Sequence, residues 1–185
     1  MGAIRQVSRV LAWVAGALML LSALLIGADV LLRNALRIAP FHSFELSRYG
    51  FAAALAFGLA FTLTERANIR IDILHRLVPR CAHPWLDVLA LLALAPVALA
   101  FAWYAWDVML QSARLGAVSN TPMAVPLVIP QTIWAAGLSW FALVALVMAL
   151  QALWALLRGR TDRVEEIGGM PGLAAEGLPP IEPRA

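Results

Sequence analysis

The sequence contains no lysine, one cysteine and three histidines in 185 residues. Because Cys81 has no second cysteine to pair with, an internal disulfide, paired-cysteine redox chemistry and a multi-cysteine metal site are excluded. No carboxylate cluster at ligand spacing accompanies the histidines, so we expect no metal and no other cofactor. A serine–histidine pair or a repeated acidic motif is missing as well, and we therefore expect no enzymatic activity.

Charged residues are also scarce. Only 14% of the residues are charged, whereas 62% are hydrophobic and the mean hydropathy is +0.81. These values differ greatly from those of an ordinary soluble domain and indicate an integral membrane protein, surrounded by the lipid bilayer. The basic residues are all arginines and lie between the apolar runs, so the net charge of +3 does not indicate a nucleic-acid partner.

Long apolar runs divide the chain. The first, from Val10 to Ala28, is longer than the roughly 7–15 residues of a signal-peptide core, so we interpret it as a transmembrane helix. We predict an all-α integral membrane protein with a short N-terminus over 1–9, a single membrane domain over 10–158 and a disordered tail over 159–185. The four predicted transmembrane helices cover approximately residues 10–32, 44–65, 85–110 and 131–157.

Two connections between these helices have distinct patterns. Between the second and third helices, the apolar residues from Ile69 to Val78 recur at helical spacing, with arginines on the other side. This pattern predicts a short amphipathic helix in the membrane interface, ended by Pro79. Between the third and fourth helices, three prolines within 122–130 prevent a regular spanning helix, so we expect an extended or partly re-entrant connection.

The arginines also predict an orientation. Four spans place both termini on one side of the membrane, and that side would carry ten of the fourteen arginines. Cytoplasmic segments are enriched in basic residues. We therefore predict that both termini are cytoplasmic.

Charged residues near the other ends of the first two helices are candidate docking groups. Asp29 and Arg33 are spaced i,i+4, and Glu45 and Arg48 are spaced i,i+3, so each couple can pair on one helix face. Six small residues within 52–60 keep the second helix thin enough for close approach of another helix. Solvated interfacial ion pairs are the alternative interpretation, and the carboxylates at the ends of the third helix, such as Asp87, are expected to reach water.

The order of several motifs resembles a known family. ADVLLRNAL ends the first helix, ELSRY and GFAAALAFGLAFTL form the second, ANIRIDIL follows, and SNTPMAVPLVIPQ precedes the last helix. From about Val10 to Leu157 the chain resembles the small membrane subunit, DctQ-like, of tripartite ATP-independent periplasmic (TRAP) transporters. The sequence departs from the family pattern at Asn68, where members often carry a histidine; an amide there cannot become charged.

This resemblance implies a function and partners. The chain would be a scaffold in the bacterial inner membrane that enlarges the fixed part of a large permease subunit. That permease would take up an organic acid, with sodium as the coupling ion, from a periplasmic solute-binding protein. No substrate site is expected in this chain, which lacks the interrupted helices and inverted repeat of transport sites. The candidate partner-docking residues are Glu45, Arg48, Asp29, Arg33, Asn68, Arg70, Asp72 and Arg76.

A different class of function is a stand-alone four-helix carrier of the drug/proton antiporter kind. Such a carrier needs an acidic group deep in its first helix. Asp29 instead follows about 19 apolar residues and lies near the exit of that helix, which argues against this alternative.

Overall fold

The computed structural model describes residues 2–36, 43–67, 78–79 and 82–169. Its helices are α1 (Gly2–Leu36), α2 (Ser43–Thr64), α4 (His83–Leu115), α5 (Val128–Leu157) and α6 (Thr161–Gly168). The described ranges contain no strand, only an isolated bridge between Val118 and Pro126. The prediction of an all-α fold is confirmed.

Four of the helices, α1, α2, α4 and α5, are long and apolar enough to cross a membrane. α1 and α4 extend beyond the predicted bounds at both ends and α5 at its start, whereas α2 differs from its predicted bounds by one residue at each end. Most of the extensions arise because the prediction stopped at charged residues and prolines, whereas helical hydrogen bonding continues past them. α1 already begins at Gly2 and includes Arg5 and Arg9. α5 begins at Val128 because Pro130 lies in its first turn, where a backbone N–H has no helical partner to lose.

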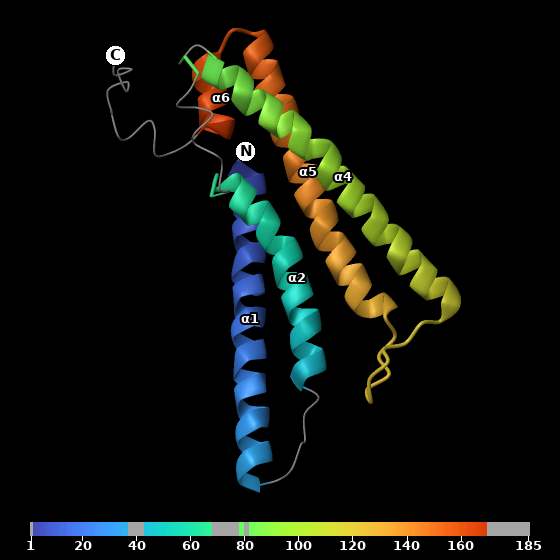
Figure 1. Cartoon of the computed structure of the whole chain (residues 1–185). Helices are drawn as coiled ribbons and strands as arrows, with labels where there is room; N and C mark the ends of the chain where they lie inside the picture. Colours follow the sequence, from blue (N-terminus) through green and yellow to red (C-terminus); the bar gives the residue numbers. More distant parts are fainter. Residues whose placement is uncertain (1, 37–42, 68–77, 80–81, 170–185) are drawn as a thin grey trace, which may run out of the picture.

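The spans form two antiparallel hairpins that lie side by side. α1 packs on α2, α2 packs on α5, and α5 packs on α4, so α2 and α5 are the central pair (Figure 1). The N-terminus, the end of α2, the start of α4 and α6 gather at one end of the bundle, which we call the Glu65 end. The opposite end, which carries the start of α2 and the α4–α5 connection, is called the Glu45 end.

The central contact between α2 and α5 is made by the smallest side chains. Ala56, Ala60 and Ala135 are fully buried there. A Cβ atom added to Gly137 would lie only 2.7 Å from the Ala56 Cβ and 3.2 Å from two backbone atoms of α2. Helices in lipid are held together by close packing rather than by the hydrophobic effect, and glycine and alanine permit this approach.

The α4–α5 connection is a closed turn. Leu127 N donates to the Ala117 carbonyl at 3.0 Å, and Ser119 N donates to the Val125 carbonyl at 2.8 Å. No residue between them is helical. The structure therefore agrees with an extended connection and shows no re-entrant helix over 117–127.

α6 differs from the expected disorder of the tail. It turns back onto α4 and α5, and Val164 is fully buried between them. Val164 and Ile167 share one face of this helix, and that face packs on the core. Gly168 lies against Leu91 and Asp87, so Asp87 is 2% exposed and does not reach water as expected. The remainder of the predicted tail, 170–185, and the predicted interfacial helix over 69–77 lie outside the described residues.

Candidate functional site: polar clusters at the two ends of the bundle

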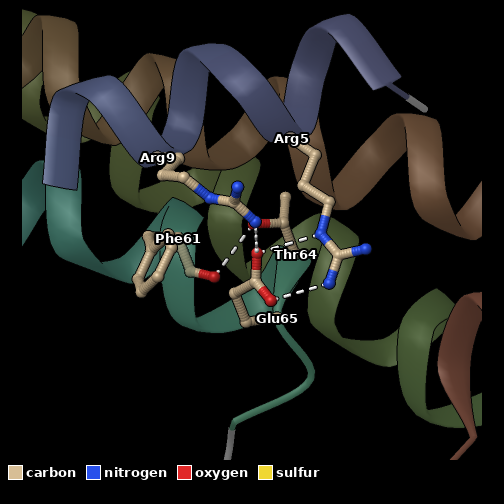
Figure 2. A network of polar contacts seen from close by, with 5 residues as sticks. All are labelled: Arg5, Arg9, Phe61, Thr64 and Glu65. Carbon is tan, nitrogen blue, oxygen red and sulfur yellow. Dashed lines mark hydrogen bonds and ion pairs between the residues drawn. The ribbon is translucent and has the colours of Figure 1, made fainter.

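The Glu65 end carries an ion cluster of Arg5, Arg9 and Glu65, which we call the Glu65 cluster. Glu65 follows directly after α2, and the antiparallel packing of α1 and α2 brings it between two arginines one turn apart on α1 (Figure 2). Arg5 donates from Nε to Oε1 at 2.9 Å and from Nη2 to Oε2 at 2.7 Å. Arg9 Nη2 donates to Oε1 at 3.3 Å.

Glu65 binds the two arginines of this cluster unequally. The hydrogen bonds from Arg5, helped by the bond from Arg9 and by both positive charges, lower the pKa of Glu65 from 4.5 to about 2, against the opposing effect of burial. Arg5 occupies both carboxylate oxygens, while Arg9 makes one longer contact. Two guanidinium groups and one carboxylate leave a net charge of +1, and Arg9 is the arginine that Glu65 holds less closely.

Two further contacts hold the Glu65 end together. Trp140 Nε1 on α5 donates to the fully buried Ser8 Oγ on α1 at 3.1 Å. Arg66 Nη1 donates to the Glu165 carbonyl on α6 at 3.2 Å. These contacts join the outer helix α1 to α5, and the end of α2 to α6.

At the Glu45 end, Asp29 links α1 to α2. Its Oδ2 atom accepts from Arg33 Nη2 at 2.9 Å and from Ser43 Oγ at 2.8 Å. The predicted pairing of Asp29 with Arg33 is therefore confirmed. Asp29 is 3% exposed, and its buried Oδ1 atom has no hydrogen-bond partner among the residues that the structure describes. Burial of a carboxylate oxygen without a donor costs free energy, and because this oxygen is buried, a donor outside the chain could reach it only if the side chains around it moved.

The same end holds a second cluster, formed by Glu45, Tyr49, Ser119 and Thr121, which we call the Glu45 cluster. The Tyr49 hydroxyl donates to Glu45 Oε1 at 2.9 Å, the Thr121 hydroxyl donates to Oε2, and Ser119 Oγ lies 2.8 Å from Thr121 Oγ1. Glu45 is buried, and the bond to Thr121 ties α2 to the α4–α5 connection.

Arg48 does not pair with Glu45, contrary to the sequence-based expectation. Tyr49, four residues after Glu45, binds the carboxylate instead, and Arg48 is exposed. Within the described ranges Arg48 makes no ion pair. It lines a cavity of about 270 Å³ together with Tyr49, Asn120 and Thr121. The Glu45 end thus presents an exposed guanidinium beside a buried, hydrogen-bonded carboxylate.

The structure does not bring all predicted site residues together. Asp29 and Arg33 share one cluster, while Glu45 belongs to another, beside Arg48. The other candidates, Asn68, Arg70, Asp72 and Arg76, lie outside the described residues. In the described part of the chain no three His, Cys, Asp or Glu side chains are arranged to hold a metal ion.

Sequence reasoning missed Glu65, Tyr49 and Thr121. A signal for Glu65 was present: Arg5 and Arg9 are spaced i,i+4, and an antiparallel second helix ends in an acidic residue at their level. Tyr49 lies one helical turn after Glu45 and within hydrogen-bonding reach of it. Thr121 carried no comparable signal, because its contact with Glu45 spans 76 residues.

Comparison with known proteins supplies the remaining observation. The family model of the DctQ component of tripartite ATP-independent periplasmic transporters matches residues 22–158. No curated protein and no solved structure matches the chain. The matched range includes α2, α4, α5, the second half of α1 and both clusters of the Glu45 end. With its four apolar helices, the chain is a multi-pass membrane protein that belongs to the family of DctQ components of tripartite ATP-independent periplasmic transporters.

Proposed function

We propose that this chain is the small subunit that scaffolds the large permease of a bacterial inner-membrane transporter. The permease takes up an organic acid delivered by a periplasmic solute-binding protein, and sodium is the coupling ion. Family membership supports the assignment to this transporter type. The substrate and ion pathway then lies in the permease, and this chain supplies fixed membrane surface.

The observation that supports the scaffold role is the distribution of charged residues, which lie at the ends of the spans and not in their middle. Val10–Ala28 of α1 and all of α5 contain no charged residue, and α2 and α5 meet through alanine and glycine. An organic anion crossing this interior would find no cationic group to balance its charge. The charged clusters lie at the two ends, where the Arg5–Glu65 pair and the Ser43–Asp29 hydrogen bond join α1 to the α2 segment.

The arginines support an orientation for this subunit. The Glu65 end carries Arg5 and Arg9, and with four spans ten of the fourteen arginines would lie on the side of the termini. Enrichment of basic residues in cytoplasmic segments supports a cytoplasmic Glu65 end and a periplasmic Glu45 end.

The permease docks, on this proposal, at the Glu45 end. Arg48 is exposed beside the cavity of about 270 Å³ and has no ion pair in the described ranges. An exposed cation near the membrane boundary favours a partner that supplies a carboxylate.

Affinity purification of the tagged chain from its native membrane, in mild detergent, tests this function. A large polytopic protein should be recovered in about equal amount, and Arg48→Ala should lower both its recovery and substrate uptake. Arg114→Ala is the matched control, because Arg114 is also an exposed arginine, in the last turn of α4 at the Glu45 end. Equal loss in both variants, or in neither, would contradict docking through Arg48.

The same purification tests the alternative function. Recovery of a homodimer without a large partner would contradict the scaffold assignment and favour a stand-alone four-helix carrier. Asp29 would then be the residue to mutate first, because it is the buried acidic group of α1.

A further inference from the structure

An apolar groove runs along α1 on the side of α2 at the Glu65 end. Its volume is about 700 Å³. The part of α1 that lines the groove begins at Arg9 and ends at Leu20. The small residues between them that line it are Ala12, Gly16 and Ala17. Trp13 of α1 and Phe61 of α2 complete the lining. A Cβ atom added to Gly16 would meet nothing within 4 Å, so the groove is open there.

Charge is confined to one end of this groove. Arg9 is its charged lining residue. Glu65 does not cancel this charge, because Arg5 binds both oxygens of the same carboxylate and the three groups together carry +1. A ligand that fits the groove therefore has an anionic group at one end and an apolar body along the rest.

The length of the groove distinguishes a lipid from a helix. From Arg9 to Leu20 the chain advances by about 16 Å along the axis of α1, which is close to half of the roughly 30 Å hydrocarbon core. The groove thus reaches from the membrane surface to about the middle of the bilayer. A docked transmembrane helix would follow α1 across both leaflets, whereas a phospholipid occupies one.

We propose that this groove binds one phospholipid with an anionic headgroup, whose phosphate pairs with Arg9 while an acyl chain lies along Gly16 toward Leu20. Basic groups between membrane helices on the cytoplasmic side are known to select anionic lipids. This inference rests on the proposed cytoplasmic orientation of the Glu65 end, but not on the transported substrate or on the docking role of Arg48.

Retained lipid is the direct test. The chain, with whatever partners purify with it, is exchanged into nanodiscs of phosphatidylglycerol and phosphatidylcholine in equal amounts, and the lipids retained after release into detergent are counted by native mass spectrometry. The wild type should retain about one phosphatidylglycerol per chain. Arg9→Gln should lower the preference for phosphatidylglycerol about five-fold, because one arginine contact is lost while Arg5 still binds Glu65.

Two glycine variants distinguish the effect of filling the groove from the effect of adding a side chain elsewhere on α1. Gly16→Leu fills the groove and should abolish specific retention of either lipid. Gly27→Leu adds the same side chain to the same helix outside the groove, also with nothing within 4 Å, and should retain lipid like the wild type. Equal retention by the two variants, or an unchanged lipid preference in Arg9→Gln, would overturn the proposal. Loss of the large partner from Gly16→Leu alone, with lipid retention unchanged, would assign the groove to a partner helix instead.

Discussion

Gly137→Ala is the most direct test of the packing between the two hairpins. The added Cβ atom would lie 2.7 Å from the Ala56 Cβ and 3.2 Å from the Ala56 carbonyl carbon and the Phe57 nitrogen. Carbon atoms pack best at about 3.5–4.0 Å. None of the three atoms belongs to a side chain that can rotate away, so α2 and α5 must separate by roughly 0.8 Å or more.

The cost of this separation is estimated from overpacked cores. An added methyl group in a well-packed core destabilises a protein by about 1–3 kcal/mol. Gly58→Ala makes the same chemical change in α2, where an added Cβ meets nothing within 4 Å. The gain in helix propensity is similar for the two variants, so their difference measures the contact itself. At about 2–4 °C per kcal/mol for a chain of this size, Gly137→Ala should melt about 2–12 °C below Gly58→Ala.

Thermal unfolding in detergent, followed by fluorescence of the seven tryptophans, measures this difference. A second substitution provides a control. Ala56→Gly removes the closest contact atom, so adding it to Gly137→Ala should recover part of the lost melting temperature. Equal midpoints for Gly137→Ala and Gly58→Ala would refute the close approach of α2 and α5.

Three other variants test the two ends of the bundle. The pKa of Glu65 is lowered from 4.5 to about 2, so its ion pairs stabilise the fold above pH 4.5 and are lost as the pH falls toward 2. The melting midpoint of the wild type should therefore decline below pH 4.5 more steeply than that of Glu65→Gln. Parallel curves for the two proteins would argue against the pairing. Thr121→Val removes a donor to the buried Glu45 and should speed hydrogen exchange of the α4–α5 connection, whereas exchange in α6 should stay unchanged. Val164→Asp buries an unpaired charge and should release α6, seen as new proteolytic cleavage near Arg160; an unchanged digest would mean that α6 is not docked.

Local patterns in the sequence predicted the spans and one polar contact. Uninterrupted apolar runs identified four transmembrane helices, because a membrane requires about 20 apolar residues in each helix. The Asp29–Arg33 pair was predicted because i,i+4 residues are neighbours on any helix. In both cases the relevant physics acts within a few turns of one helix, so the sequence alone contains it.

Contacts between helices could not be predicted in the same way. Glu45 was expected to pair with Arg48 but binds Thr121 across the bundle, and Glu65 joins Arg5 over a separation of 60 residues. Such pairings depend on which helices are neighbours and on their relative height in the membrane. α6 was missed for a related reason: a polar eight-residue segment is helical here because Val164 finds a buried site between α4 and α5.

The helices α5 and α1 differ greatly in how much of their surface is buried within the chain, and this difference indicates where lipids or partners should bind. Hydrocarbon gives helices no hydrophobic reason to associate, so close packing and polar bonds must hold them. In the most apolar window of α5, 44% of residues are buried within the chain, against 6% in that of α1. Substitutions in α5 should therefore change the stability of the chain itself, as for Gly137. Substitutions in α1 should change what binds to it, because its Gly16 groove and most of its apolar surface remain available to lipid or to a partner.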